Sequence, residues 1–227
     1  GVVAALGLDG IVVRDLVRHP ENANTVLGTV FFLMLVSGLI AATLAIGTIT
    51  WLRPEDALTK TIVAILGFRL VFVPSNVIRY WFQAQVRSKY TVWVDTGVFL
   101  LIAAAKAAMI VYQLPLIAFA WVMLIETILA SLALFGVYWK QNNVPKKWKT
   151  SRADLFLLIK DGISLILMTI FLGIYTKIDQ VMINQILGDK ASGIYAAAVI
   201  FAESWFFLAI IFTHSIFPKL IQQREEN

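Results

Sequence analysis

Long apolar stretches dominate this chain and leave it few possible folds. A helix that crosses a bilayer needs about 20 mostly apolar residues. We predict spanning helices over six ranges: Val26–Leu52, Thr61–Phe82, Val92–Tyr112, Leu116–Trp139, Gly162–Leu187 and Ile194–Phe217. Only 15% of the 227 residues are charged, against about 25% in soluble domains. The sequence therefore predicts an all-α fold, a polytopic transmembrane helix bundle.

Lysine and arginine fall mainly on one side of these predicted spans. Segments 1–24, 79–90, 140–160 and 219–227 hold 13 of them, whereas 53–60, 113–115 and 188–193 hold 3. Cytoplasmic loops carry this excess, so we expect both ends of the chain on the cytoplasmic side. Because the chain starts with Gly1 and stops just after the last span, we also expect it to be a piece of a longer protein.

Several charged side chains lie inside the predicted spans, where burial in hydrocarbon costs several kcal/mol. Such residues usually face a bundle interior or a wet cavity. On the predicted helix Gly162–Leu187, the helical period gathers further polar side chains into the same arc as Lys177. The resulting candidates for a substrate path are Arg69, Lys106, Lys177, Asp179, Gln180, Asn184, Glu126, Glu203 and Asp95. The alternative is that these groups only pair with one another and tie helices together.

Local signals predict further details. At 100° per residue, Asn76, Tyr80 and Gln83 share a face with Arg69, and Pro74 predicts a kink in the same helix. Small residues at Ser37, Ala41 and Ala45, with Gly38 and Ala42 beside them, predict a close helix contact. We expect an amphipathic interfacial helix over Ala153–Lys160 and a tight turn over Gly188–Gly193.

No catalytic motif is present, and the chain has no cysteine. A P-loop, a nucleophile elbow and an HExxH zinc motif are all missing from the sequence. We therefore expect a transporter rather than an enzyme, with no cofactor and no metal, although H⁺ or Na⁺ coupling stays open. The basic residues follow the membrane topology, so we expect membrane lipids, and not nucleic acid, as partners.

Three stretches resemble a known family. Residues 175–220, YTKIDQVMINQILGDKASGIYAAAVIFAESWFFLAIIFTHSIFPKL, resemble the start of the second half of bacterial polysaccharide flippases, which belong to the multidrug/oligosaccharidyl-lipid/polysaccharide exporter superfamily. Residues 7–22, GLDGIVVRDLVRHPEN, resemble the end of the second helix of that family. Residues 77–90, VIRYWFQAQVRSKY, resemble the inner end of its fourth helix.

The resemblance implies a division of the chain. Residues 1–139 would be the end of helix two and helices three to six of an N-terminal bundle. Residues 140–160 would be a cytoplasmic basic linker, and residues 161–227 the first two helices of a pseudo-symmetric C-terminal bundle. At Ile200 this chain departs from the related lipid II flippases, which carry a functional arginine three residues before the acidic residue of the eighth helix. That role is therefore not carried over.

The resemblance also implies a substrate and a place. The substrate would be an oligosaccharide on undecaprenyl pyrophosphate, flipped across the bacterial inner membrane for O-antigen, capsule or exopolysaccharide synthesis. Polysaccharide polymerase and chain-length proteins would be partners. Two alternatives stay open. One is a drug/cation antiporter of the same superfamily, and the other is a membrane polysaccharide polymerase or glycosyltransferase.

Overall fold

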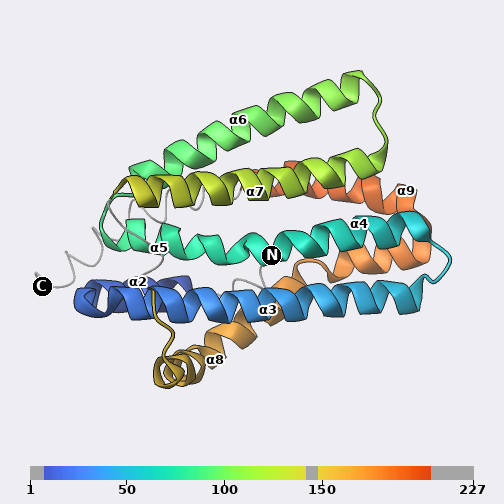
Figure 1. Cartoon of the computed structure of the whole chain (residues 1–227). Helices are drawn as coiled ribbons and strands as arrows, with labels where there is room; N and C mark the ends of the chain where they lie inside the picture. The colour runs from blue at the N-terminus through green and yellow to red at the C-terminus, as the bar shows by residue number, and fades with distance from the viewer. Residues whose placement is uncertain (1–7, 142–147, 206–227) are drawn as a thin grey trace, which may run out of the picture. The chain divides into compact units, whose positions relative to one another are not determined.

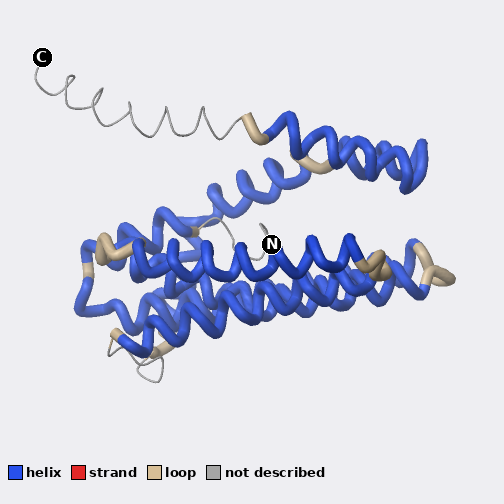
Figure 2. The backbone as a smooth tube through the Cα atoms, turned by 90° about the horizontal axis from the view of Figure 1, so that it is seen from above, coloured by secondary structure: helices blue, strands red, loops and turns tan. Residues whose placement is uncertain are grey.

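The computed structural model describes residues 8–141 and 148–205, and these residues form helices and loops without a strand (Figure 2). Five helical stretches in this part of the chain are long and apolar enough to cross a membrane: Pro20–Leu52, Ala57–Ala84, Lys89–Val111, Leu116–Lys140 and Asp154–Glu203. The all-α prediction is confirmed, and the chain is a multi-pass membrane protein. It divides into two compact units, residues 1–171 and 172–227, which we describe separately.

The first unit contains most of the helices (Figure 1). In chain order these are α2 (Asp9–Arg18), η1 (Pro20–Asn22), α3 (Ala23–Leu52), α4 (Ala57–Phe68), η2 (Arg69–Asn76), α5 (Val77–Ala84), α6 (Lys89–Val111), α7 (Leu116–Lys140) and most of α8 (Arg152–Tyr175). The first four predicted spans correspond to α3, the continuous passage α4–η2–α5, α6 and α7. Helix α2 ends at Arg18, directly before His19-Pro20.

An apolar core joins α2, α3, α5, α7 and α8 within this unit. Its fully buried members include Met34 of α3, Phe82 of α5 and Tyr138 of α7. Close packing of this kind holds helices together in lipid, where the surroundings are as apolar as the core itself.

Gly38 allows α3 to approach η2 closely. A Cβ atom at this position would lie 2.7 Å from the backbone oxygen of Leu70, which is closer than packed carbon and oxygen atoms can come. Ala42, one turn further along α3, is also buried. The predicted small-residue contact is therefore made through Gly38 and Ala42, while Ala45 is exposed.

The segment η2 changes the helix geometry around Pro74. Proline has no backbone N–H and disrupts the α-helical hydrogen-bond ladder, and here eight residues adopt the tighter 3₁₀ form. A 3₁₀ helix turns about 120° per residue instead of about 100°, so the predicted face is only partly correct. Asn76 lines the same cavity as Arg69, but Tyr80 packs on the apolar core and Gln83 is exposed.

Residues 148–151, which precede α8, are held against the rest of the first unit by hydrogen bonds and ring contacts. The Trp148 indole donates a hydrogen bond to the Tyr138 hydroxyl at 3.1 Å and packs near Phe31. Ser151 then caps α8 by accepting from the Asp154 amide. The predicted short helix over Ala153–Lys160 is wrong, because those residues form the first turns of the 24-residue α8.

The prediction of one helix over Gly162–Leu187 is also wrong. The structure ends α8 at Tyr175 and begins α9 (Ile178–Glu203) after a turn. At that turn the Lys177 amide bonds to the carbonyl of Ile174, three residues back, and Lys177 leaves the helical φ range at −128°. Asp179 then lies in the first turn of α9, where a negative charge is favourable.

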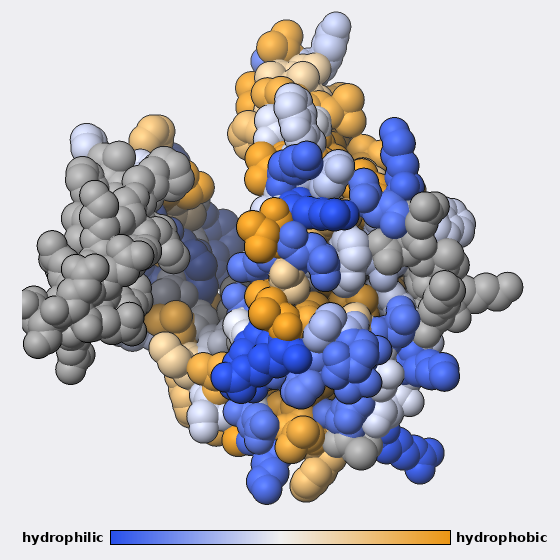
Figure 3. Space-filling view, turned by 90° about the vertical axis from the view of Figure 1, so that its left-hand side faces the viewer, coloured by the Kyte–Doolittle hydropathy of each residue, from blue (hydrophilic) through white to orange (hydrophobic). Residues whose placement is uncertain are grey.

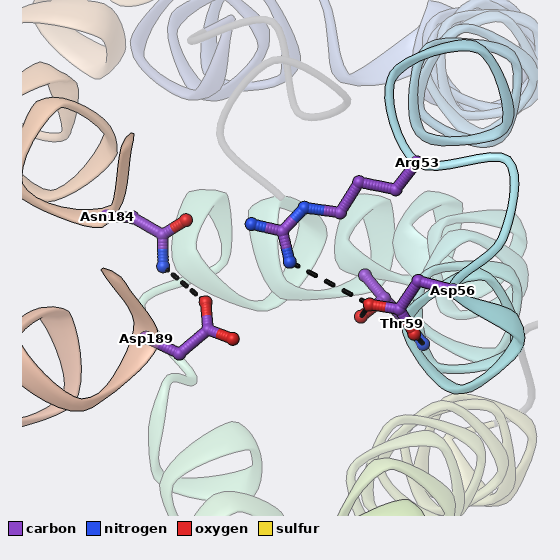
Figure 4. A network of polar contacts seen from close by, with 5 residues as sticks. All are labelled: Arg53, Asp56, Thr59, Asn184 and Asp189. Atoms are coloured by element: carbon purple, nitrogen blue, oxygen red, sulfur yellow. Dashed lines mark hydrogen bonds and ion pairs between the residues drawn. The ribbon is translucent and has the colours of Figure 1, made fainter. Parts of the chain in front are cut away.

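The second unit is organised by a hairpin in α9 (Figure 1). Gly188 has φ +82°, a conformation that favours glycine, and divides α9 into two helical arms. Across the turn, the Asn184 amide donates to the Asp189 carboxylate at 2.8 Å (Figure 4), and further along Tyr195 donates to Asp179. The predicted turn is confirmed at Gly188, but residues 189–193 are helical. The predicted span Ile194–Phe217 lies partly outside the described residues.

Hydrophilic side chains gather at one end of the first unit (Figure 3). At this end α5 and α7 finish and α3 and α6 begin, and the exposed cations there include Arg18, Arg87, Lys89 and Lys140. The predicted cytoplasmic face would lie at this end.

Candidate functional site

A cavity of about 820 Å³ lies within the first unit, between the passage α4–η2–α5 and the helices α6 and α7. Apolar residues such as Phe72, Phe99 and Met123 make up part of its wall. The polar residues that line it are Arg69, Ser75, Asn76, Arg79, Asp95, Glu126, Thr127 and Ser131. Arg69 lies near the middle of the 28-residue spanning stretch Ala57–Ala84, so the cavity reaches membrane depth.

Arg69 is held in this cavity by a neutral side chain. Its Nε donates to Thr127 Oγ1 at 2.5 Å, and the Thr127 hydroxyl in turn donates to the Met123 carbonyl at 3.1 Å. Among the described residues, no carboxylate forms an ion pair with Arg69. Because Nε is used for positioning, the two terminal nitrogens of the guanidinium remain for a ligand.

Arg79 lies one 3₁₀ segment further along the same wall, and it is held in a similar way. Its Nε donates to Asn76 Oδ1 at 3.0 Å. Unlike Arg69, it also has an ion-pair partner, because its Nη1 donates to Asp95 Oδ2 from α6. Both cavity arginines are therefore oriented by a hydrogen bond from Nε to a neutral side chain. Only Arg79 also has a carboxylate that neutralises its charge, among the described residues.

Hydroxyl groups fasten η2 to α7 beside these arginines. Ser75 and Ser131 are hydrogen-bonded to each other at 2.9 Å, and Ser131 Oγ lies 2.8 Å from the Thr127 carbonyl oxygen and 3.3 Å from that of Phe72. These contacts satisfy polar groups that would otherwise be costly at membrane depth. They also fix the part of the wall from which Arg69 projects.

Glu126 is paired across the α6–α7 interface. Lys106 Nζ lies 3.1 Å from Glu126 Oε2. Glu126 lines the cavity, whereas Lys106 does not. This partly exposed ion pair links α6 to α7.

Comparison with known proteins gives one match. A family model described as polysaccharide biosynthesis protein matches residues 2–224, nearly the whole chain. The chain belongs to this family. No curated protein and no solved structure matches it. The family places this membrane protein in polysaccharide biosynthesis.

The nine predicted path residues of this polysaccharide biosynthesis protein fall into two groups. In the first unit the structure brings Arg69, Asp95 and Glu126 to one cavity, with Lys106 behind Glu126. The remaining five are in the second unit and lie at the start, turn and end of α9: Lys177, Asp179, Gln180, Asn184 and Glu203. For all nine residues a role in the substrate path stays a prediction.

Sequence reasoning missed two important residues of the cavity in this polysaccharide biosynthesis protein. Arg79 was counted with the cytoplasmic segment 79–90, although it belongs to α5. Thr127 was overlooked because it carries no charge. The helical period gives a signal for it, since Met123, Thr127 and Ser131 recur every four residues on one face of α7.

Proposed function

We propose that this polysaccharide biosynthesis protein is a flippase that moves lipid-linked oligosaccharide units across the membrane. The observation that carries the proposal is Arg69, a cation near the middle of a membrane-spanning passage that faces a cavity without a carboxylate partner among the described residues. A cation in this position is costly unless an anion or water compensates it.

The chemistry of a lipid-linked sugar fits this wall. Its phosphate groups cannot cross hydrocarbon unaided, and arginine binds phosphate through parallel hydrogen bonds. Asn76, which is only half-buried, adds a neutral amide group that can hydrogen-bond sugar hydroxyls. The apolar side chains Phe72 and Phe99 offer surfaces to the less polar faces of sugar rings.

Substitution of Arg69 in the full-length protein tests the proposal. Arg69→Ala should leave the protein in the membrane and strongly reduce polysaccharide at the cell surface. Arg69→Lys should keep part of the export, because it keeps the charge but loses the paired hydrogen bonds. Normal export from a well-expressed Arg69→Ala protein would contradict the proposal.

A second measurement separates the flippase from a polymerase. Without a flippase, single lipid-linked oligosaccharide units should accumulate on the cytoplasmic leaflet, where a sugar-specific reagent added outside does not reach them. Without a polymerase, the same units should accumulate but be accessible from outside. For a drug/cation antiporter, Arg69→Ala should change drug tolerance and leave polysaccharide unchanged.

A further inference from the structure

The two cavity arginines differ in a way that the proposed function does not explain. Each guanidinium is fixed at Nε by a neutral oxygen, which leaves its terminal nitrogens directed to other partners. For Arg69 these nitrogens have no carboxylate partner among the described residues. For Arg79, Asp95 occupies one of them. A carboxylate on α6 therefore takes the position that a phosphate oxygen would need.

We propose that Asp95 is an internal counter-ion of the cavity, which occupies the anion-binding edge of Arg79 until a phosphate-bearing ligand displaces it. The inference rests on the proposed function and adds a regulation of the same site. In the ligand-free protein one arginine is open to anions and the other is blocked. A phosphate group of the ligand gains Arg79 by exchange with Asp95.

The geometry makes this exchange physically reasonable. Both partners face the cavity, and their side chains are 29% exposed for Arg79 and 47% exposed for Asp95. Ion pairs that are this open to solvent are weak, whereas arginine can bind phosphate through two parallel hydrogen bonds. After displacement, the Asp95 carboxylate remains in the cavity, so water can solvate it.

The other cavity charges do not offer the same exchange. Glu126 is already paired with Lys106, which lies outside the lining of the cavity. Release of Glu126 would therefore expose no further cation in the cavity wall. Among the described residues that line the cavity, Arg79 is the cation that an internal carboxylate blocks.

Binding of inorganic pyrophosphate to the full-length protein in detergent micelles tests the inference. We expect Asp95→Asn and Asp95→Ala to bind pyrophosphate roughly fivefold more tightly than the wild type in a calorimetric titration, because a competing charge is removed. Glu55→Gln is the matched control, since it removes an exposed carboxylate in the loop between α3 and α4, away from the cavity. Its dissociation constant should equal that of the wild type.

Further variants keep the result interpretable. Asp95→Glu retains the carboxylate and should bind as weakly as the wild type. The gain should disappear in the double variant Arg79→Gln/Asp95→Asn. The inference is overturned if Asp95→Asn shows no tighter or no saturable binding, if Glu55→Gln gives the same gain, or if the gain survives without Arg79.

The two proposals fail in different measurements. Normal export from Arg69→Ala would contradict the flippase but leave the effect of Asp95 on pyrophosphate affinity intact. An unchanged affinity in the Asp95 variants would remove the counter-ion and leave the need for Arg69 in export intact.

Discussion

Arg69 and Thr127 are 58 residues apart in the sequence, and the Nε of one lies 2.5 Å from the Oγ1 of the other. The bond joins η2 to α7. Since the Thr127 hydroxyl hydrogen is directed to the Met123 carbonyl, a lone pair of its oxygen is left for the arginine. Thr127 is thus a positioning residue for the cation that carries the proposed function.

Replacement of Thr127 should therefore weaken anion binding without removing any charge. Thr127→Val keeps the shape but loses the acceptor, and a hydrogen bond to a charged group is worth about 1.5–3 kcal/mol. We expect pyrophosphate affinity to fall roughly tenfold in the purified full-length protein. Thr127→Ser keeps the hydroxyl and should bind like the wild type. Equal binding by the valine and serine variants would show that the hydroxyl does not position Arg69.

The Lys106–Glu126 pair should behave as a structural unit. Lys106→Met and Glu126→Gln each leave one charge without its partner at membrane depth, so each should lower the thermal unfolding midpoint. The double variant should recover part of the loss, with a coupling energy of about 1 kcal/mol because both side chains are partly exposed. If the stability losses of the two single variants simply add in the double variant, the interaction between Lys106 and Glu126 contributes nothing to the fold.

Gly38 should not tolerate a larger side chain. Gly38→Ala would place a methyl group 2.7 Å from the Leu70 oxygen and force α3 away from η2, at a cost of about 1–3 kcal/mol. Gly47, on the same helix, has no atom within 4 Å of a built Cβ. Gly47→Ala should therefore raise stability slightly, as alanine favours the helix. The two variants are compared by their thermal unfolding midpoints in the same detergent. Similar midpoints would contradict the close contact between Gly38 and η2.

Asp56 should stabilise the start of α4 in a pH-dependent way. The Thr59 hydroxyl and amide, which both donate to its carboxylate, hold the pKa of Asp56 below its usual value, and Arg53 lies 3.8 Å away (Figure 4). Because the folded pKa is lowered, the stabilisation is present above the unfolded pKa of about 3.9. It is lost as the pH falls through the folded pKa.

Hydrogen exchange at the Thr59 amide measures this effect. Near neutral pH, protection should be lower in Asp56→Ala than in the wild type, after correction for the intrinsic exchange rate. The difference should shrink as the carboxylate is protonated in acid. A difference that does not depend on pH would show that the carboxylate charge has no part in the cap.

Hydropathy predicted the membrane helices best where a span is one uninterrupted α-helix, as for α3, α6 and α7. It failed where the helix geometry changes. The prediction that Asn76, Tyr80 and Gln83 share a face with Arg69 assumed 100° per residue through Pro74. The 3₁₀ form of η2 turns further per residue and changes which side chains share that face. For Gly162–Leu187 the apolar residues on both sides of Lys177 make the stretch long enough to span. Lys177 and Asp179 were therefore interpreted as charges inside one helix, and not as part of the turn between α8 and α9.

The candidate site was predictable in its charges and not in their contacts. Arg69, Asp95 and Glu126 were found because a charge inside an apolar stretch is conspicuous. Which carboxylate neutralises which cation depends on the way α6 lies against α5 and α7, and one-dimensional patterns do not contain that information. Thr127 escaped notice because hydroxyl groups are common in membrane helices.

The 3₁₀ segment η2 also limits how the length of this part of the protein can change during evolution. Arg69 and Arg79 lie on either side of most of it and line the same cavity. Loss or gain of one residue between them would turn Arg79 by about 120° relative to Arg69 and remove it from the wall. A change of three residues would restore its direction and shift it along the axis by about 6 Å. Insertions and deletions tolerated here should therefore come in multiples of three residues.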